Sequence, residues 1–240
     1  MTNDEIAEAI ADALFVNGLG EQADRQILVD GRLAEDTHKR VWKAIASKLD
    51  ALHGLGAQLT QITQSDSGPV AVTAEQRLNY GQTLAKLGDS YTLAVRGAQA
   101  KEAQTLKDDS HVASIAVMDT TASIAANLDS LQDNAKLSAI HLLDKGQPLA
   151  LNVSQLTSDA DALAKIQGNY SMAVSGVAAA DALALAQNSK VSTLSVSDTG
   201  EGIVASLSDL ARLGSKLGSI RGSSSSSECA LIVVVRVRAR

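Results

Sequence analysis

The chain reads Ser114-Ile-Ala-Val-Met-Asp-Thr-Thr-Ala-Ser-Ile-Ala-Ala-Asn-Leu-Asp-Ser-Leu131, and later, position for position, it reads Thr193-Leu-Ser-Val-Ser-Asp-Thr-Gly-Glu-Gly-Ile-Val-Ala-Ser-Leu-Ser-Asp-Leu210. Both stretches belong to a longer match of residues 84–131 with residues 163–210, which needs no gap and holds 19 identities in 48 positions. Self-similarity at a fixed period is typical of stacked repeat proteins, in which each unit buries its apolar face against its neighbours. The match therefore predicts a repeat architecture.

Each copy contains short alternating stretches followed by helical ones. Apolar residues at every second position predict strands at residues 114–117, 138–142, 171–174 and 193–196, with similar strands at 92–95, 59–62 and 27–29. Apolar residues with the period of a helix are Ile124, Leu128 and Leu131, then Ile203, Leu207 and Leu210, and finally Val41, Ile45, Leu49 and Leu52. Strands separated by helices predict right-handed crossovers and parallel pairing. We therefore expect an α/β fold, a right-handed β/α solenoid resembling a leucine-rich-repeat coil, with short parallel strands.

The composition fits close stacking of such coils. Hydrophobic residues make up 45% of the 240-residue chain, but aromatic residues make up only 2%. Alanine-rich stretches such as residues 178–186 let neighbouring helices approach closely, and wide aromatic-lined ligand pockets are not expected. The longest apolar run, residues 230–235, is far shorter than the roughly 20 residues of a membrane-spanning helix. We expect no membrane span.

The charge is uneven along the chain. Residues 1–220 carry 17 Lys and Arg against 26 Asp and Glu, a net charge of −9, whereas residues 221–240 carry four Arg against Glu228, a net charge of +3. An acidic body argues against nucleic-acid binding, which depends on clustered basic residues. Because Cys229 is the single cysteine, no intramolecular disulfide and no cysteine metal site can form. The first residues lack a basic segment followed by an apolar one, so we expect no cleaved secretory signal.

Three regions follow from these patterns. Residues 1–35 are an expected N-terminal capping region, with an amphipathic helix over residues 3–16 that either caps the solenoid or binds a partner. Residues 36–221 are the expected β/α repeat. Residues 222–240 change composition abruptly, into a Ser-rich linker and a basic tail, and are interpreted either as an edge strand or as a non-native extension.

One tripeptide suggests chemistry. Asp198-Thr199-Gly200 matches the tripeptide of aspartic proteases, in which paired aspartates share a proton. Its counterpart Asp119-Thr120-Thr121 lacks the glycine, and both precede an aliphatic helix, where Asp or Thr accepts backbone hydrogen bonds as an N-cap. We favour the cap, also for Asp36-Thr37 and Ser158-Asp159, and keep a hydrolase with Asp198 as acid/base group as the alternative.

The other polar motifs predict no catalytic, cofactor-binding or metal residue. The four histidines, for which surface positions are expected, have no metal-ligand spacing: His38, His53, His111 and His141. Asp66-Ser-Gly68 and Asp144-Lys-Gly146 carry turn chemistry, and a calcium site there lacks the support of a recognised calcium motif. Residues 18–23 resemble a dinucleotide fingerprint but follow a helix where a strand is required, so we discard that interpretation.

Several stretches resemble repeats of very large bacterial secreted or surface proteins of the adhesin type. They are residues 119–131 with Lys136-Leu-Ser-Ala-Ile140, Asp161-Ala-Leu-Ala-Lys-Ile166 and Tyr170-Ser-Met-Ala-Val174, within a match covering about residues 55–220. The resemblance implies an extended spacer or adhesive scaffold, exported without a cleaved signal and sometimes found beside calcium-binding modules. It carries no catalytic residue to this chain.

These observations predict a non-enzymatic structural or binding repeat module. Its expected partner is a protein or surface ligand, or a second copy of itself, and not nucleic acid. The expected location is secreted or at the cell surface, with the cytoplasm as the alternative. Two other functions stay open: a hydrolase using Asp198, and an assembly module that self-associates through open solenoid ends.

Overall fold

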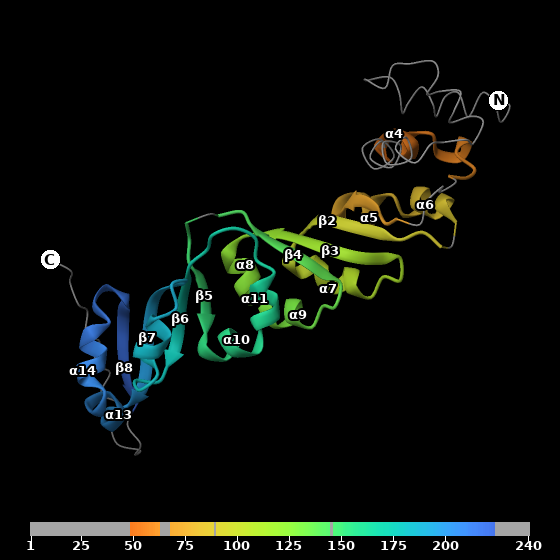
Figure 1. Cartoon of the computed structure of the whole chain (residues 1–240). Helices are drawn as coiled ribbons and strands as arrows, with labels where there is room; N and C mark the ends of the chain where they lie inside the picture. The colour runs from red at the N-terminus through yellow and green to blue at the C-terminus, as the bar shows by residue number, and fades with distance from the viewer. Residues whose placement is uncertain (1–48, 63–67, 89, 145, 224–240) are drawn as a thin grey trace. The chain divides into compact units, whose positions relative to one another are not determined.

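A computed structural model describes residues 49–62, 68–88, 90–144 and 146–223 (Figure 1). Within these residues helices alternate with short strands. The strands are β1 (Val70–Thr73), β2 (Leu93–Ala98), β3 (Val112–Asp119), β4 (Leu137–Leu142), β5 (Leu149–Asn152), β6 (Met172–Val177), β7 (Val191–Thr199) and β8 (Leu217–Ser223).

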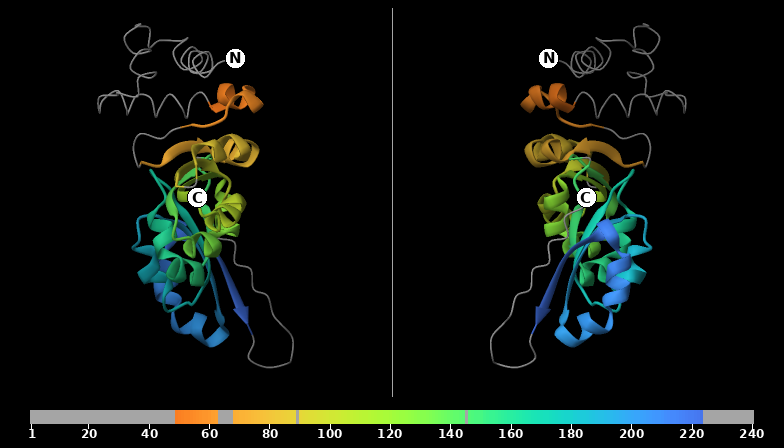
Figure 2. Two further views of the ribbon diagram at one scale, coloured as in Figure 1. Left: turned by 90° about the vertical axis from the view of Figure 1, so that its right-hand side faces the viewer. Right: turned by 90° about the vertical axis from the view of Figure 1, so that its left-hand side faces the viewer.

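The strands form two four-stranded parallel sheets, and neither sheet is closed. Their orders are β1-β2-β3-β4 and β5-β6-β7-β8, so within each sheet every strand lies beside the next one in the chain. The register places Val70 opposite Leu93 in the first sheet and Leu149 opposite Met172 in the second. Figure 2 shows β8, the blue arrow, at the edge of its sheet. The predicted α/β class with parallel strands is confirmed.

The helices that join the strands are short. They are α4 (Leu49–Gly54), α5 (Ala74–Asn79), α6 (Gly81–Leu84), α7 (Ala100–Lys107), α8 (Thr121–Ala126), α9 (Leu128–Gln132), α10 (Val153–Ser158), α11 (Ala160–Ala164), α12 (Ala182–Ala186), α13 (Gly200–Ala205) and α14 (Leu207–Arg212), with 3₁₀ turns η1 (Gly56–Gln58), η2 (Ala85–Leu87) and η3 (Gly214–Lys216). Four connections are pairs of helices separated by one joint residue: Tyr80, Asn127, Asp159 or Ser206. At each joint φ lies between −115° and −105°, so the break in the helix is itself repeated.

Internal contacts divide the chain into two compact units, residues 1–98 with 105–116 and residues 99–104 with 117–240. In the first, Val72, Leu93 and Val95 are buried on alternating strand positions. In the second, Ile140, Val174 and Leu194 fill the same role. No helix in the described part of the chain is both long enough and apolar enough to cross a bilayer.

Most predicted strands are confirmed. Those at residues 92–95, 114–117, 138–142, 171–174 and 193–196 fall on β2, β3, β4, β6 and β7. The strand predicted at residues 59–62 is wrong. The Ile62 N–H donates to the Lys86 carbonyl at 2.7 Å, but this single backbone hydrogen bond to another segment does not make a strand. The strand at 27–29, the helix at 3–16 and residues 224–240 lie outside the described residues. Gly222 and Ser223, expected to start the linker, belong to β8.

The helix stripe is confirmed in one copy and fails in the next. Ile124, Leu128 and Leu131 are all buried. In the later copy Leu210 is buried, but Leu207 is 53% exposed because no described helix follows α14 to cover it. Small residues do occupy close contacts, since the side chains with no exposed surface include Ala98, Ala103, Ala179 and Ala182.

Candidate functional site

Asp198 and Asp119 hold equivalent positions at the ends of β7 and β3. Asp198 accepts the backbone N–H of Ala179 at 2.8 Å and that of Thr199 at 2.7 Å. Asp119 accepts the N–H of Ala100 at 2.9 Å and that of Thr120 at 2.8 Å. Each carboxylate thus ties the end of one strand to the segment that leaves the preceding strand. The aspartate of the Asp-Thr-Gly tripeptide is part of a repeated backbone clasp.

Asp144 makes a similar clasp after β4. Thr121 donates its backbone N–H to Asp144 Oδ1 at 2.7 Å and its hydroxyl to Oδ2 at 2.9 Å. The turn predicted at this place is confirmed, because Gln147 N–H bonds to the Asp144 carbonyl at 3.2 Å and Gly146 adopts φ of 102°. Both carboxylate oxygens of Asp144 therefore already have partners in the protein.

The clasps favour ionised carboxylates. Hydrogen bonds from the Ala179 and Thr199 N–H groups lower the pKa of Asp198. The Thr121 N–H in the same way lowers the pKa of Asp144. At Asp119 burial acts to raise the pKa, but hydrogen bonds from Ser123, Ala100 and Thr120 outweigh it and the pKa is lowered. A carboxylate held ionised in this way is poorly suited to donate a proton as a general acid.

The threonines after these aspartates cap the following helices, as predicted. Thr120 accepts the N–H of Ser123 at 3.2 Å, and Thr199 accepts that of Gly202 at 3.1 Å. The corresponding cap predicted at Ser158-Asp159 is wrong, because the Asp159 side chain makes no cap bond to α11. It accepts the Ser158 hydroxyl at 2.9 Å instead. Asp36 and Thr37 lie outside the described residues.

Asp159 is a buried carboxyl group. It is 2% exposed, and its Oδ2 atom has no hydrogen-bond partner. Burial raises its pKa, and the neighbouring carboxylate of Asp129 raises it further. The sequence predicts Asp159 only as a helix cap and does not reveal its burial, because the charged residues that act on it, Asp129 and Asp133, come from an earlier part of the chain.

The histidines have structural contacts. His53 Nδ1 lies 2.9 Å from the Thr83 hydroxyl, and its ring stacks on Tyr80. His111 is half-buried rather than at the surface, because its ring stacks on buried Tyr91 with centroids 4.1 Å apart. His141 is exposed as predicted. His38, Asp66 and residues 18–23 are not among the described residues. Within the described part of the chain, no three His, Cys, Asp or Glu side chains are grouped to hold a metal ion.

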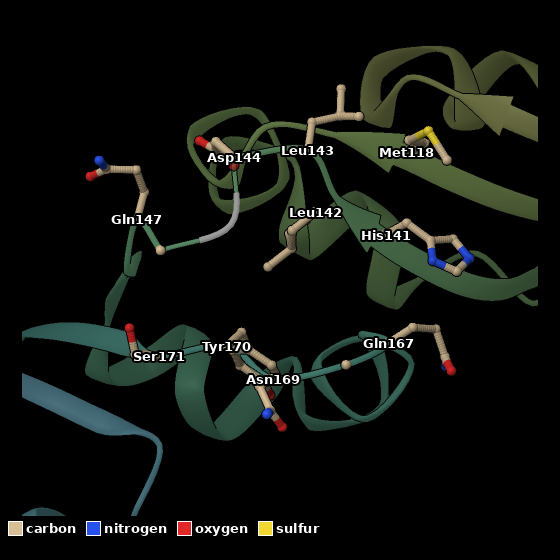
Figure 3. Close-up of a pocket in the computed structure, with 12 residues that line it drawn as sticks. Met118, His141, Leu142, Leu143, Asp144, Gln147, Gln167, Asn169, Tyr170 and Ser171 are labelled. Atoms are coloured by element: carbon tan, nitrogen blue, oxygen red, sulfur yellow. The ribbon is translucent and has the colours of Figure 1, made fainter.

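A cleft with a volume of about 970 Å³ lies in the second unit (Figure 3). Met118 and residues 141–144 and 146–147 line one side, and residues 167–171 line the other. The sequence does not predict it, because the two sides come from segments well separated along the chain and the motif at Asp144 indicates only a turn.

The cleft lies where two backbone segments stop pairing. Ile140 N–H donates to the Lys165 carbonyl at 2.9 Å, and Gln167 N–H donates to the Ile140 carbonyl at 2.8 Å. The next bond between the two segments runs from Leu149 N–H to the Ser171 carbonyl at 2.8 Å. Between these points the segments separate, and the polar side chains of the intervening residues surround the opening.

Comparison with known proteins gives no relative: no family model, no curated protein and no solved structure matches the chain.

Proposed function

We propose that the chain is a non-enzymatic β/α solenoid that serves as a structural and binding module of a bacterial secreted or surface protein, with a protein or surface ligand as its partner. The strand order in both sheets supports a coil, because each connection within a sheet returns to the next neighbouring position. The copies also agree in spacing. The first strands of the two sheets begin at Val70 and Leu149, and the same offset relates residues 84–131 to residues 163–210.

The observation that carries this proposal is the repeated clasp at Asp119 and Asp198. The chain's best candidate for acid/base chemistry makes the same two backbone hydrogen bonds as its counterpart in the earlier copy. Because these bonds join adjacent segments in both copies, they support a structural role for both aspartates. The bacterial surface setting rests on the resemblance of residues 55–220 to adhesin-type repeats.

Matched variants test this proposal against the hydrolase alternative. Asp198→Asn and Asp119→Asn each replace an ionised acceptor by a neutral amide, and we expect both to lower the melting temperature. The native chain should release no product from casein or from p-nitrophenyl esters. Hydrolysis that Asp198→Asn abolishes and Asp119→Asn leaves intact, with both variants folded by circular dichroism, would overturn the proposal.

Self-association is a second candidate function, favoured by the exposed face of the last described helices. Val204 is 66% exposed and Leu207 is 53% exposed, and they lie on α13 and α14 beside the edge strand β8 (Figure 1). Exposed apolar residues next to an open strand edge favour pairing with another chain. Light scattering over a concentration series should then show dimers that Leu207→Asp dissociates, and a monomer at every concentration would dismiss this function.

A further inference from the structure

The cleft in the second unit interrupts a parallel ladder, and this interruption leaves backbone groups beside the opening. In a parallel pair, alternate residues of one strand bond to the same neighbour. The backbone of Ile140 bonds to residues 165 and 167, and the backbone N–H of Leu143 bonds to Asp119 on the opposite side. Because the two sides alternate, the backbone N–H and C=O of Leu142 face the cleft. Among the described residues no backbone bond joins Leu142 to Gln167 or Asn169. Backbone donors and acceptors therefore line the cleft.

The side chains around the opening are rich in amides. Gln147, Gln167 and Asn169 are all exposed there, and each amide offers both donors and acceptors. Figure 3 shows Gln147 near one end and Gln167 near the other, with Asn169 and Tyr170 across from Leu142. Such a lining suits a ligand that carries many groups able both to donate and to accept hydrogen bonds, as hydroxyl groups do.

The charges of the described lining residues favour a neutral ligand. Among its described lining residues there is no Lys or Arg to attract an anion. The one carboxylate, Asp144, has both oxygens engaged by Thr121, so it does not require a cation. Lys190, a cation beside the lining residue Tyr170, already bonds to the Tyr170 hydroxyl and lies over its ring. A phosphate, a sulfated sugar or a metal ion would therefore find no unsatisfied opposite charge on the described lining residues.

The cleft also has an apolar part. Met118 is 43% exposed and Leu143 is 61% exposed, whereas most large hydrophobic residues in the described part of the chain are buried. Tyr170 is held in place, because Lys190 Nζ donates to its hydroxyl at 3.1 Å and the hydroxyl donates to the Leu163 carbonyl at 3.3 Å. Lys190 Nζ also lies over the Tyr170 ring, 4.2 Å from its centroid, so that face of the ring is already occupied. The exposed aliphatic side chains of Met118 and Leu143 are the surface that suits the apolar C–H faces of a ligand that also carries hydroxyl groups.

From these features we propose that the cleft binds a neutral oligosaccharide. The amides and backbone groups bond to its hydroxyls, and the exposed side chains of Met118 and Leu143 contact its C–H faces. This inference deepens the proposed binding module and rests on it, because it names the class of surface ligand that the module takes.

The test is a titration of the full chain, labelled with nitrogen-15, with three neutral probes: maltotriose, cellotriose and triacetylchitotriose. Trigalacturonic acid serves as the charged counterpart. We expect at least one neutral probe to shift the amide signals of Gly168, Asn169 and Gln147 at millimolar concentrations, and the acidic probe to bind more weakly. Asn169→Ala and Gln147→Ala should each weaken binding by about tenfold. Gln104→Ala, which removes an exposed amide outside the cleft, should leave binding unchanged.

Several results would overturn the inference. They are the absence of shifts with all three neutral probes, tighter binding of the acidic probe, or an equal effect of Gln104→Ala and Asn169→Ala. The amide spectrum of each variant shows at the same time whether it is folded, so a loss of binding is not confused with unfolding. None of these results bears on hydrolysis or on the Asp119 and Asp198 clasps, so the proposed module is tested separately.

Discussion

Leu128 and Leu207 hold the same position in the two matching segments, yet Leu128 is fully buried and Leu207 is 53% exposed. Both begin the second helix of a broken pair, α9 and α14. The difference comes from the next part of the chain. The helices α10 and α11 pack against α9, whereas no described helix follows α14. The same leucine position therefore contributes differently to the free energy of unfolding in the two copies, because following helices cover it in only one of them.

This contrast predicts unequal costs for the same substitution. Leu128→Ala leaves a cavity among packed helices and should lower the free energy of unfolding by about 2–5 kcal/mol. Leu207→Ala, at an exposed site, should lower it by less than about 1 kcal/mol. Urea denaturation of both variants measures the two costs. Equal losses would show that α14 is covered in solution.

The sequence predicts strands well where the alternation is long enough to identify a face. Ile115 and Val117 on β3, and Leu194 and Val196 on β7, are buried as their spacing indicates. The strands β1 and β5 are not predicted, because each directly follows a proline, Pro69 or Pro148, that is typical of a turn.

The cleft and the buried Asp159 could not be predicted in the same way. Both depend on how segments distant in sequence meet, and neither leaves a local pattern. Residues 59–62 show the opposite error, since they copy the pattern of residues 137–140 but lack the ladder that makes β4 a strand. A repeat thus predicts which positions correspond, but the neighbours of each copy decide what those positions become.

Gly176 has a positive φ angle, as does its counterpart Gly97 in the earlier copy. Its φ is 73°, its counterpart Gly97 has φ of 69°, and Gly176 lies at a register shift between β6 and β7. A Cβ atom at Gly176 would meet no neighbour, so the cost of Gly176→Ala is backbone strain alone, about 1–2 kcal/mol. Gly200→Ala is the control, because Gly200 has free space and no positive φ. Thermal melts should show a loss for the first variant only.

Thr120 tests the helix cap. Its hydroxyl oxygen accepts the Ser123 N–H at the start of α8. Thr120→Ala should lower the free energy of unfolding by about 1 kcal/mol, and Thr120→Ser, which keeps the hydroxyl, should recover most of that loss. Chemical denaturation compares the two. If the serine variant is as unstable as the alanine variant, the threonine contributes by packing and not by capping.

The pKa of Asp159 is raised in the folded protein, whereas the pKa values of Asp119, Asp144 and Asp198 are lowered. We therefore expect the contribution of Asp159 to stability to change with pH in the opposite direction. Burial and the neighbouring Asp129 raise its folded pKa above the ordinary value of 3.8. A group whose pKa rises on folding adds stability in full below its unfolded pKa, and that stability is lost as pH rises through the folded pKa. At neutral pH the ionised carboxylate is therefore unfavourable, and Asp159→Asn should raise the melting temperature.

The pH profile of this gain separates titration of Asp159 from packing. The gain should shrink as the pH is lowered toward 3.8 and vanish below it, because the buried carboxyl group is then neutral in both states. Ser206→Ala, at the corresponding joint between α13 and α14, is the control and should not change the profile, because serine does not titrate. An equal gain for Asp159→Asn at pH 3 and pH 7 would contradict a raised pKa and assign the effect to packing.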